Sequence, residues 1–505
     1  MELCDIYLQK LFLIDPTIND FFCKTEWGHK RHIQPNVYSE PYYEKLDKLV
    51  QVFLKRVKKK KEKTLYDTLL LKDLLYSIHM EKDYEIYMYM PIDLHNNILI
   101  TYVTYSSGNG SYAFSDKDSY SDFSKRLKSL PDITDTIIEK LNNGIDNNVL
   151  LYSGVVKAMS QQIKDILYNK SYKHTKRTKY SKQLNKDIDL YLVTCLNTLL
   201  LYLLNDYKLQ DSFGLQSYKG GKKAYREIIK HAISSSSKPE EIQRYGYSEL
   251  RRISQKMKGL QTKIKDVHYD TEKDVIDDLN KIQTMLKKQV APLFKQPLTT
   301  YKIKPVPPEN KHMYAYYSLT TKTFYINTHN LENIKKHELL VLSLHEGNPG
   351  HHFQTQLHQK SNVPEYTKLG NTLFIEGWAF YCENLFPYQD SMEYYHKLRY
   401  DLNRTLRLLI DTGIHYFGWS YTKCFKLLQK HMKTSDKETN RMLLRYICLP
   451  GQALTYKLGG NKLLQLREDF KQKGYSTKEF HTALMEKGSI SLDELTSHLT
   501  ETYLS

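Results

Sequence analysis

The sequence lacks several features that would place it in a special class of protein. It has 15 prolines and 21 glycines among 505 residues, too few for a collagen-like or low-complexity chain. Its six cysteines form no CxxC pair and no regular framework, so we expect free thiols and a reducing compartment. The length exceeds what one compact core accommodates and suits two or three packed lobes.

We expect neither a targeting segment nor a membrane-spanning segment. The N-terminal segment Met1–Asp5 has neither the basic region nor the small-residue cleavage site of a secretory signal. The most apolar stretch, Leu190–Leu204, is shorter than the ~20 residues that span a bilayer. We therefore predict a buried core helix there and a cytoplasmic protein without a membrane partner, while a nuclear or virion location stays open.

Negative charge is scarce relative to positive charge. The chain has 74 Lys plus Arg and 57 Asp plus Glu, which gives a formal net charge of +17. Such an excess is typical of proteins that bind nucleic acid. However, the preference for Lys, Asn and Ile, together with 42 Tyr against 17 Phe, is also what an AT-rich coding sequence would give. We interpret the charge as background composition and expect no nucleic-acid partner.

Helical periodicity dominates the first 300 residues. Leu250, Ile253 and Met257, for example, recur at the spacing of one helical face. The basic run Lys55–Lys61 follows another apolar helical face, and we interpret it as the solvated end of that helix rather than as a nuclear-localisation or phosphate-binding patch. Five prolines between positions 292 and 308 then predict a lobe boundary at 295–310.

A different texture follows these prolines. Met313–Ser318 and Lys322–Asn327 are aromatic and β-branched, which predicts a small hairpin or sheet edge. Helical patterns return from Leu331 onward. The predicted fold is therefore mainly α, with one small β-sheet beside a catalytic helix, a helical N-terminal lobe over residues 1–300 and a catalytic lobe over residues 301–505.

The densest group of chemically active side chains follows the apolar run Leu339–Leu344. It reads HEGNPGHH over residues 345–352. Hydrophobic packing does not require three histidines and a glutamate at the end of a buried segment, so we interpret them as functional side chains. A metal site that activates water needs neutral imidazole ligands and a nearby carboxylate that takes the proton, and this segment offers both.

The spacing of these histidines does not suit an undisturbed helix. Zinc helices usually place two histidines at i and i+4, but Pro349 occupies the i+4 position from His345. On a straight helix His345 and His352 would lie about 10.5 Å apart along the axis, too far for one zinc ion. Pro349 and Gly350 therefore predict a bulge of about two residues that brings His351, or alternatively His352, to the metal.

A third ligand is expected from the apolar segment 374–383. Glu376 lies within it, and Glu383 follows seven residues later on the same helical face. A carboxylate in so apolar a setting needs a partner, and a metal ion is one. We predict that Glu376 binds the metal and that Glu383 orients a ligating histidine. The alternative is an amphipathic helix with two solvated glutamates.

These segments resemble a known family. HEGNPGHH over 345–352 and EGWAFYCE over 376–383 are similar to the HExxPGHH and EGWAxYxE motifs of the family called domain of unknown function 885, which is grouped with the HExxH-type metallopeptidases. The second segment also resembles the NEGFAxYxE segment of the M1 aminopeptidases, whose first glutamate is the third zinc ligand. Segments 407–419, 445–459 and 480–488 are similar to further motifs of the family, so the resemblance covers roughly residues 215–500.

The resemblance implies a zinc-dependent peptidase that cleaves oligopeptides and holds one Zn²⁺ per chain. Glu346 would be the general base, beside the ligands His345, His351 or His352, and Glu376. The other candidates are oxyanion donors (Tyr446, Tyr456 and His415), a second residue that orients a ligand (Asp411), anchors for a substrate carboxylate (Arg407 and Arg445), and a strand that would bind substrate backbone (Tyr325 and Asn327).

Two other kinds of function stay open. A catalytically silent relative would use the pocket for binding, and a basic polyanion-binding or virion-associated protein would use the peptidase lobe as a scaffold. The combination of His345, Glu346 and Glu376 favours the enzyme. The sequence does not define the peptide substrate, the end preference or the oligomeric state.

Overall fold

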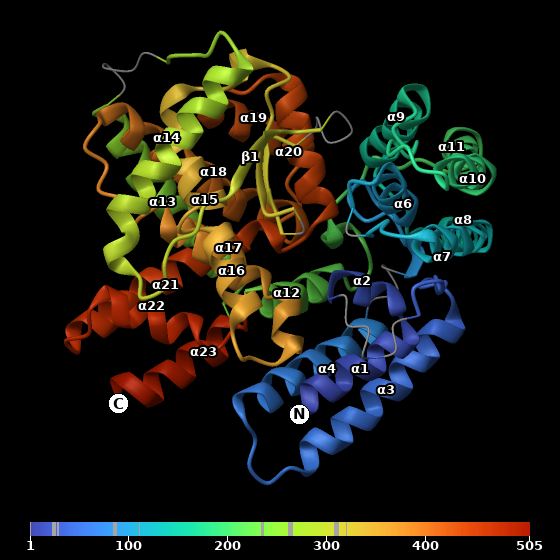
Figure 1. Ribbon diagram of the computed structural model, residues 1–505, viewed down its shortest axis with the longest axis horizontal. Helices are drawn as coiled ribbons and strands as arrows, with labels where there is room; N and C mark the ends of the chain where they lie inside the picture. Colours follow the sequence, from blue (N-terminus) through green and yellow to red (C-terminus); the bar gives the residue numbers. More distant parts are fainter. Residues whose placement is uncertain are drawn as a thin grey trace. The chain divides into compact units, whose positions relative to one another are not determined.

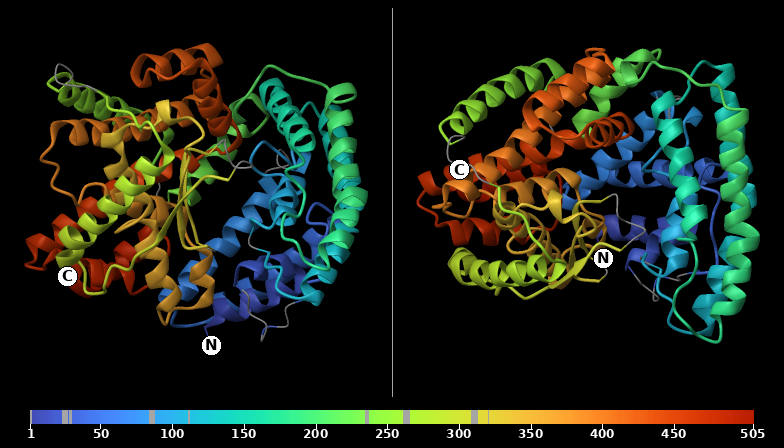
Figure 2. Two further views of the ribbon diagram at one scale, coloured as in Figure 1. Left: turned by 45° about the horizontal axis from the view of Figure 1, so that its top comes forward. Right: turned by 90° about the horizontal axis from the view of Figure 1, so that it is seen from above.

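The computed structural model describes residues 2–22, 27, 30–83, 88–110, 112–233, 237–260, 266–307, 313–319 and 321–505. The chain is mainly helical with one small three-stranded sheet, as the sequence predicts (Figures 1 and 2). It divides into two compact units, Met1–Gly221 and Lys222–Ser505.

The first unit is built from helices that bury their apolar faces against one another. Pairs such as α3 and α4, α1 and α3, and α9 and α11 pack together. The bounds are α1 Leu3–Ile14, η1 Pro16–Ile18, α2 Asn19–Phe22, α3 Glu40–Lys59, α4 Leu65–Asp83, α6 Ile98–Ser107, α7 Lys117–Leu127, α8 Leu130–Asp146, α9 Ser153–Asn169, α10 Ser181–Asp187, η3 Ile188–Val193, α11 Thr194–Asn205 and η4 Leu215–Ser217.

The second unit contains the sheet and the remaining helices. The bounds are α12 Gly221–Ala232, α13 Pro239–Lys258, α14 Glu272–Val290, η6 Ala291–Leu293, η8 Leu331–Asn333, η9 Lys336–Glu338, α15 Leu339–Glu346, α16 His351–Lys360, η10 Glu365–Leu369, α17 Thr372–Cys382, α18 Ser391–His415, α19 Tyr421–Met432, α20 Asp436–Cys448, η11 Gln452–Leu454, α21 Thr455–Gln472, α22 Thr477–Met485, α23 Leu492–Leu499 and η12 Thr500–Leu504.

The boundary between the units lies near Gly221 and not near residue 300, where the prolines placed it. Helices α13 and α14 belong to the second unit because α13 packs along α18 and α14 packs against α15. The prolines instead mark the turn η6 and the loops around the first strand. Breaks in periodicity thus located a change of secondary structure rather than a division between units.

The basic run at 55–61 lies at the end of a helix, as predicted. Helix α3 buries Val50, Phe53, Leu54 and Val57 on one face and ends at Lys59. Cations at a helix C-terminus face the negative end of its dipole, which favours them there.

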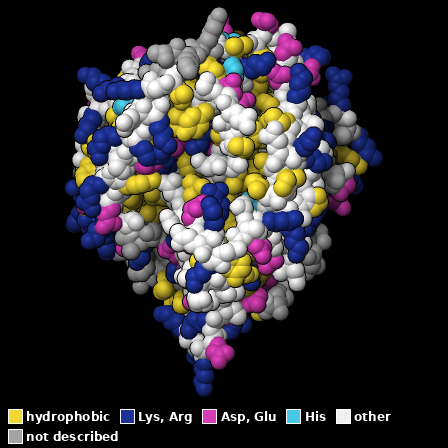
Figure 3. Space-filling model, turned by 90° about the vertical axis from the view of Figure 1, so that its left-hand side faces the viewer, with side chains coloured by type: hydrophobic (Ala, Val, Ile, Leu, Met, Phe, Trp, Pro, Cys, Tyr) yellow, Lys and Arg dark blue, Asp and Glu magenta, His cyan; other side chains and the backbone are white. Residues whose placement is uncertain are grey.

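On the face of the molecule in Figure 3, Lys and Arg side chains are scattered mostly toward the edges, with hydrophobic side chains gathered between them.

One helical stretch, Ser181–Asn205, is long and apolar enough to cross a membrane by length and composition alone. Its most apolar window has a mean hydropathy of 1.5, and 44% of that window is buried. Leu196 and Leu199 are fully buried, whereas Leu190 and Leu201 are exposed. The predicted core helix is therefore buried on one face, and because core helices of soluble proteins pass the same length test, the stretch is weak evidence for a membrane span.

The cysteines of the described residues are free thiols, as predicted. Four of these five are buried, and Cys23 lies outside the described part of the chain.

The sheet has the strand order β1-β3-β2, with β1 at Lys302–Pro305, β2 at Ala315–Ser318 and β3 at Thr323–Ile326. The antiparallel pair β2–β3 confirms the predicted hairpin. Strand β1 pairs in parallel with β3 and was not predicted, because its four residues end in a proline and strand β2 separates it from β3 in the sequence. Phe324 and Ile326 of β3 pack with Leu339 and Leu342 of α15, which holds the sheet against the helix that ends at His345.

Helices α17 and α21 meet at backbone distance. A Cβ atom on Gly377 would lie 2.7 Å from the carbonyl carbon of Gly459 and 2.8 Å from its Cα. Only residues without a side chain allow this approach. The contact fixes Glu376 of α17 relative to Tyr456 of α21.

We predict that Gly377→Ala lowers the free energy of unfolding by about 1–3 kcal/mol or more, because the clashing atoms are backbone atoms and cannot rotate away. Gly259→Ala is the matched control, since its Cβ would meet only the Lys256 carbonyl oxygen at 3.7 Å. Urea unfolding followed by circular dichroism measures both. Equal stability losses in the two variants would contradict the close contact.

Candidate metal centre

The helix is interrupted at the position where the sequence predicts a bulge. Helix α15 ends at Glu346 and α16 begins at His351, so residues 347–350 lie between them, more than the two residues expected. The Asn348–Pro349 peptide bond is cis. Gly350 lets the chain return against α15, because a Cβ there would lie 1.9 Å from the His345 carbonyl oxygen. The interruption places His351 beside His345.

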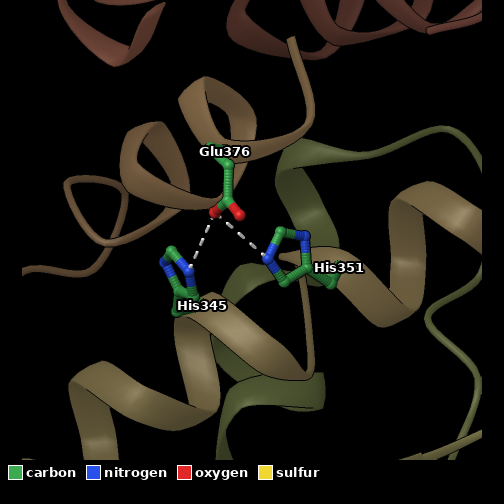
Figure 4. Close-up of side chains that lie close together, drawn as sticks. All are labelled: His345, His351 and Glu376. Carbon is green, nitrogen blue, oxygen red and sulfur yellow. Dashed lines mark ion pairs between the residues drawn. The ribbon is translucent and has the colours of Figure 1, made fainter. Parts of the chain in front are cut away.

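Three side chains from three helices converge at this break (Figure 4). His345 lies at the end of α15, His351 at the start of α16 and Glu376 on α17. The Nε2 atoms of both histidines are 3.6 Å from Oε2 of Glu376. One possible ligand atom from each residue lies within 4.8 Å of the other two.

The donor set fits a tetrahedral metal ion. A separation of 3.6 Å is too long for a hydrogen bond, and Glu376 Oε2 is buried without a hydrogen-bond partner among the described residues. Ligand atoms about 2.1 Å from a tetrahedral zinc ion would be about 3.4 Å apart, close to the 3.6 Å that separates Glu376 Oε2 from each histidine. Two imidazoles and one carboxylate also form a known catalytic zinc set that leaves one position for water.

The three side chains stabilise one another's charge. Burial lowers the pKa of His345, but Glu376 and Glu383 outweigh it and raise the pKa to about 9. Burial likewise opposes ionisation of Glu376, while the two histidines hold the pKa of its carboxyl well below its usual range. The two histidines therefore favour the anionic form of Glu376, the form in which a carboxylate binds a metal.

Glu383 holds the other side of the His345 ring. Its Oε1 lies 2.8 Å from Nδ1 of His345 and 2.6 Å from Nη2 of Arg404. The Nδ1–H group that donates to Glu383 fixes the ring so that Nε2 faces the cluster, where it can bind a metal once its own proton has left. This is the placement expected of a residue that orients a histidine ligand. Arg404 was missed, although it precedes Arg407 by three residues and so shares its helical face.

His352 points away from the cluster. Its Nε2 lies 2.9 Å from the hydroxyl oxygen of Thr299, and its Nδ1 lies 2.9 Å from that of Tyr317. Burial lowers its pKa to about 4, so the ring is neutral near pH 7. Of the two alternatives for the second histidine, the structure brings His351 to the cluster.

Glu346 reaches the sheet from the last turn of α15. Its Oε2 accepts a 2.9 Å hydrogen bond from the backbone N–H of Tyr317 on β2. Strand β2 lies at an edge of the three-stranded sheet, so this bond fixes the carboxylate beside that edge. Neither Tyr317 nor Thr299 was predicted to contact the histidine segment, because both contacts join distant parts of the sequence.

Tyr456 stacks on His345, with ring centroids 6.3 Å apart and planes 13° apart. The Arg407 guanidinium lies 4.4 Å above the centre of the Tyr456 ring. The Tyr456 hydroxyl accepts hydrogen bonds from Arg445 Nη2 at 3.3 Å and from Gln452 Nε2 at 3.2 Å. The structure therefore brings Tyr456, Arg407 and Arg445 together next to His345.

Comparison with known proteins places this geometry in a family. The family described as "Bacterial protein of unknown function (DUF885)" matches residues 23–499. The chain belongs to this family. The match extends well before residue 215, so most of the first unit is shared with the DUF885 family as well. No curated protein matches the chain.

Two solved structures share the fold of this DUF885 chain. A protein from Colwellia psychrerythraea has a TM-score of 0.86 at 19% identity, with 99% of this chain and 97% of that chain covered. A protein of unknown function from Shewanella oneidensis has a TM-score of 0.70 at 15% identity, with 99% of each chain covered. Each is described as a "putative lipoprotein".

The lipoprotein description of both structures contradicts the cytoplasmic location that we expected from the N-terminal sequence. That expectation rested on the lack of a recognisable leader and on thiol usage, and neither feature reports directly on where a protein resides.

Two residues of the DUF885 motifs lie in core contacts rather than at the cluster. His415 Nε2 lies 2.8 Å from the backbone oxygen of Tyr446, and its ring stacks on Tyr225 at 5.4 Å between centroids. Asp411 accepts hydrogen bonds from the Tyr225 hydroxyl and from the backbone N–H of Gly451. Asp411 therefore holds the turn before η11, and the structure gives it no contact with the three clustered side chains in the described residues.

The strand proposed to bind substrate backbone cannot do so through β3. Strand β3 lies between β1 and β2, so both of its edges are already paired. Tyr325 stacks on Tyr316 of β2 at 5.0 Å, and Asn327 Nδ2 donates to the Met313 carbonyl oxygen at 2.8 Å. Both residues support the hairpin. The sequence could not show this, because strand order depends on the unpredicted strand β1.

Asp411 makes stability depend on pH. Burial raises its pKa to about 7, although Tyr225 and Gly451 donate hydrogen bonds that lower it. In the unfolded chain the carboxyl ionises near pH 3.9. Between about pH 4 and pH 7 the folded state therefore retains a proton that the unfolded chain releases, and stability falls as the pH rises.

We predict that the free energy of unfolding of the wild type, minus that of Asp411→Asn, decreases from pH 4 to pH 7 and then levels off. Urea unfolding at stepped pH measures this difference. The same subtraction with the exposed residue Asp270 replaced by Asn should give a smaller slope. Equal slopes for the two variants would show that Asp411 is ionised throughout the folded state.

Proposed function

We propose that this DUF885 chain is a zinc-dependent peptidase that hydrolyses peptide bonds in oligopeptides. The observation that carries the proposal is the convergence of His345, His351 and Glu376 within 4.8 Å at the end of the helix that carries Glu346. One zinc ion per chain suits this donor set. Glu383, bonded to His345, supports the orientation that such a ligand needs.

The residues around the site have distinct roles in this proposal. Zinc, when bound, supplies a Lewis acid that lowers the pKa of water and polarises a carbonyl oxygen. Glu346 accepts the proton of the attacking water and passes it to the leaving amine. The Tyr317 amide holds Oε2 of Glu346, which leaves Oε1 for the proton.

We take Tyr456 as the oxyanion donor, because its ring stacks on His345. Its hydroxyl, held by Arg445 and Gln452, would donate a hydrogen bond to the developing negative charge. Arg407 and Arg445 place positive charge next to the site and would bind a substrate carboxylate. Such an anchor favours cleavage near a chain end.

Strand β2 replaces β3 as the proposed strand for substrate binding. It is an edge strand, and its Tyr317 amide is bonded to Glu346. An extended peptide that pairs with an edge strand gains main-chain hydrogen bonds. Pairing along β2 would carry the scissile bond past the general base.

We expect Glu346→Gln to retain zinc and to lose at least about 100-fold in turnover, because an amide cannot accept the proton. Glu376→Ala should instead lower the zinc content, since it removes a ligand atom. Elemental analysis of purified protein measures the zinc, and mass spectrometry of a peptide library measures cleavage and reveals the end preference.

The exposed Glu486 supplies the matched control, and Glu486→Ala should keep both zinc and turnover. Undiminished cleavage by Glu346→Gln would refute the assigned base. A wild-type protein that binds zinc but cleaves no peptide would support the silent relative. Retention on nucleic acid that weakens steeply with salt would support the polyanion-binding protein.

A further inference from the structure

A cavity of about 400 Å³ opens at the C-terminal end of α17, one helical turn beyond Glu376. Helices α13, α18 and α21 and the segment between α17 and α18 contribute the rest of its lining. None of the three clustered side chains lines it. Its volume is within the range of pockets that bind small organic molecules.

Positive charge predominates in this cavity. Arg252, Lys256, Lys397 and Lys457 line it, whereas Asp401 is the one acidic residue in the lining. Negative partners are available for two of these cations. Both Arg252 and Lys457 form ion pairs with Asp401 and with a nearby glutamate.

That glutamate is Glu249, whose Oε2 lies 2.7 Å from Arg252 Nη2 and 2.8 Å from Lys457 Nζ. Asp401 pairs with Lys457 and lies 3.7 Å from Arg252 Nη2. Two carboxylates thus balance two of the four cations. Lys256 and Lys397 remain as the excess positive charge.

Lys397 is the unusual member of the group. Its side chain is 8% exposed, yet its ammonium has no hydrogen bond and no ion pair within the part of the chain that the structure describes. Asp401 and Glu383 attract it from a distance, while Lys457 and Arg252 repel it. An unpaired ammonium on a largely buried side chain is unfavourable, and burial lowers the pKa of Lys397. An anion in the cavity would supply the missing partner.

The remaining walls are largely aromatic. Phe380, Phe386, Tyr388 and Tyr394 line the cavity, and the side-chain amides of Asn384 and Asn461 add hydrogen-bonding groups. Flat apolar walls favour a flat apolar ligand, whose edges or faces stack on the rings. Cationic and aromatic groups in one cavity favour a ligand that combines an acidic group with an aromatic ring.

We propose that this cavity binds a small aromatic anion, a carboxylate or a phosphate ester, with its charge against Lys397. The site is separate from the proposed metal centre, so the inference stands whether or not the chain binds zinc. It also stands whether or not the chain cleaves peptides.

Calorimetric titration of the full chain with benzoate and with phenyl phosphate tests the proposal, and it distinguishes the two acidic heads. We expect at least one of them to bind, and acetate and benzylamine to bind at least tenfold more weakly. Acetate lacks the ring, and benzylamine carries the opposite charge on the same ring.

Lys397→Met keeps the apolar stem, removes the ammonium, and should weaken binding of the better probe at least tenfold. Lys426→Met, on the exposed face of α19, is the matched control and should bind as the wild type does. Phe386→Ala removes one aromatic wall and provides a second variant, which should weaken the aromatic probe more than it weakens acetate. Thermal unfolding of each variant verifies that it is folded.

Three results would overturn the proposal. The first is no binding of either aromatic anion to the wild type at a dissociation constant below about 1 mM. The second is equal affinity of wild type and folded Lys397→Met. The third is equal affinity for benzylamine and for the better-binding aromatic anion, which would show that the ring alone is recognised.

Discussion

The arrangement of the second unit depends on a carboxylate with one buried oxygen that has no hydrogen-bond partner among the described residues. Glu376 lies on α17, and its Oε2 faces two imidazoles at 3.6 Å, beyond hydrogen-bonding distance. A buried anion needs a compensating positive charge. The break after α15, the backbone contact between α17 and α21, and the Glu383–Arg404 pair all serve to hold these groups in one place. A divalent metal would bind the carboxylate oxygen and both imidazoles at once. The zinc proposal therefore also accounts for the contacts that hold these three side chains in place.

Local features of this site were predictable from sequence because they depend on neighbours in the chain. Pro349 and Gly350 cannot continue a regular helix, so the interruption between two histidines follows from residue chemistry alone. Glu376 and Glu383 share a helical face for the same kind of reason. The aromatic segments around β2 and β3 likewise predicted a hairpin. In each case the residues are close together in the chain, so their spacing alone determines how they lie relative to one another.

The features that sequence reasoning missed depend on contacts between distant segments. Strand β1 pairs with β3, although β2 lies between them in the sequence. This pairing places β3 at the centre of the sheet and β2 at an edge. Arg404 reaches Glu383 because α18 packs against α15, a contact between segments far apart in the sequence. Asp411 and His415 show the opposite error, because a family motif marks residues that hold a fold together as well as residues that do chemistry. The unit boundary near Gly221 was missed because helix packing, rather than proline content, decides which helices share a core.

X-ray absorption at the zinc edge, recorded on the purified full chain with one equivalent of zinc, tests the central claim most directly. The ligand set predicts nitrogen and oxygen neighbours at about 2.0–2.1 Å and the outer-shell scattering of two imidazole rings. Sulfur neighbours at about 2.3 Å would assign the metal to cysteines instead. A spectrum of zinc surrounded by water alone would show that His345, His351 and Glu376 do not form a metal site.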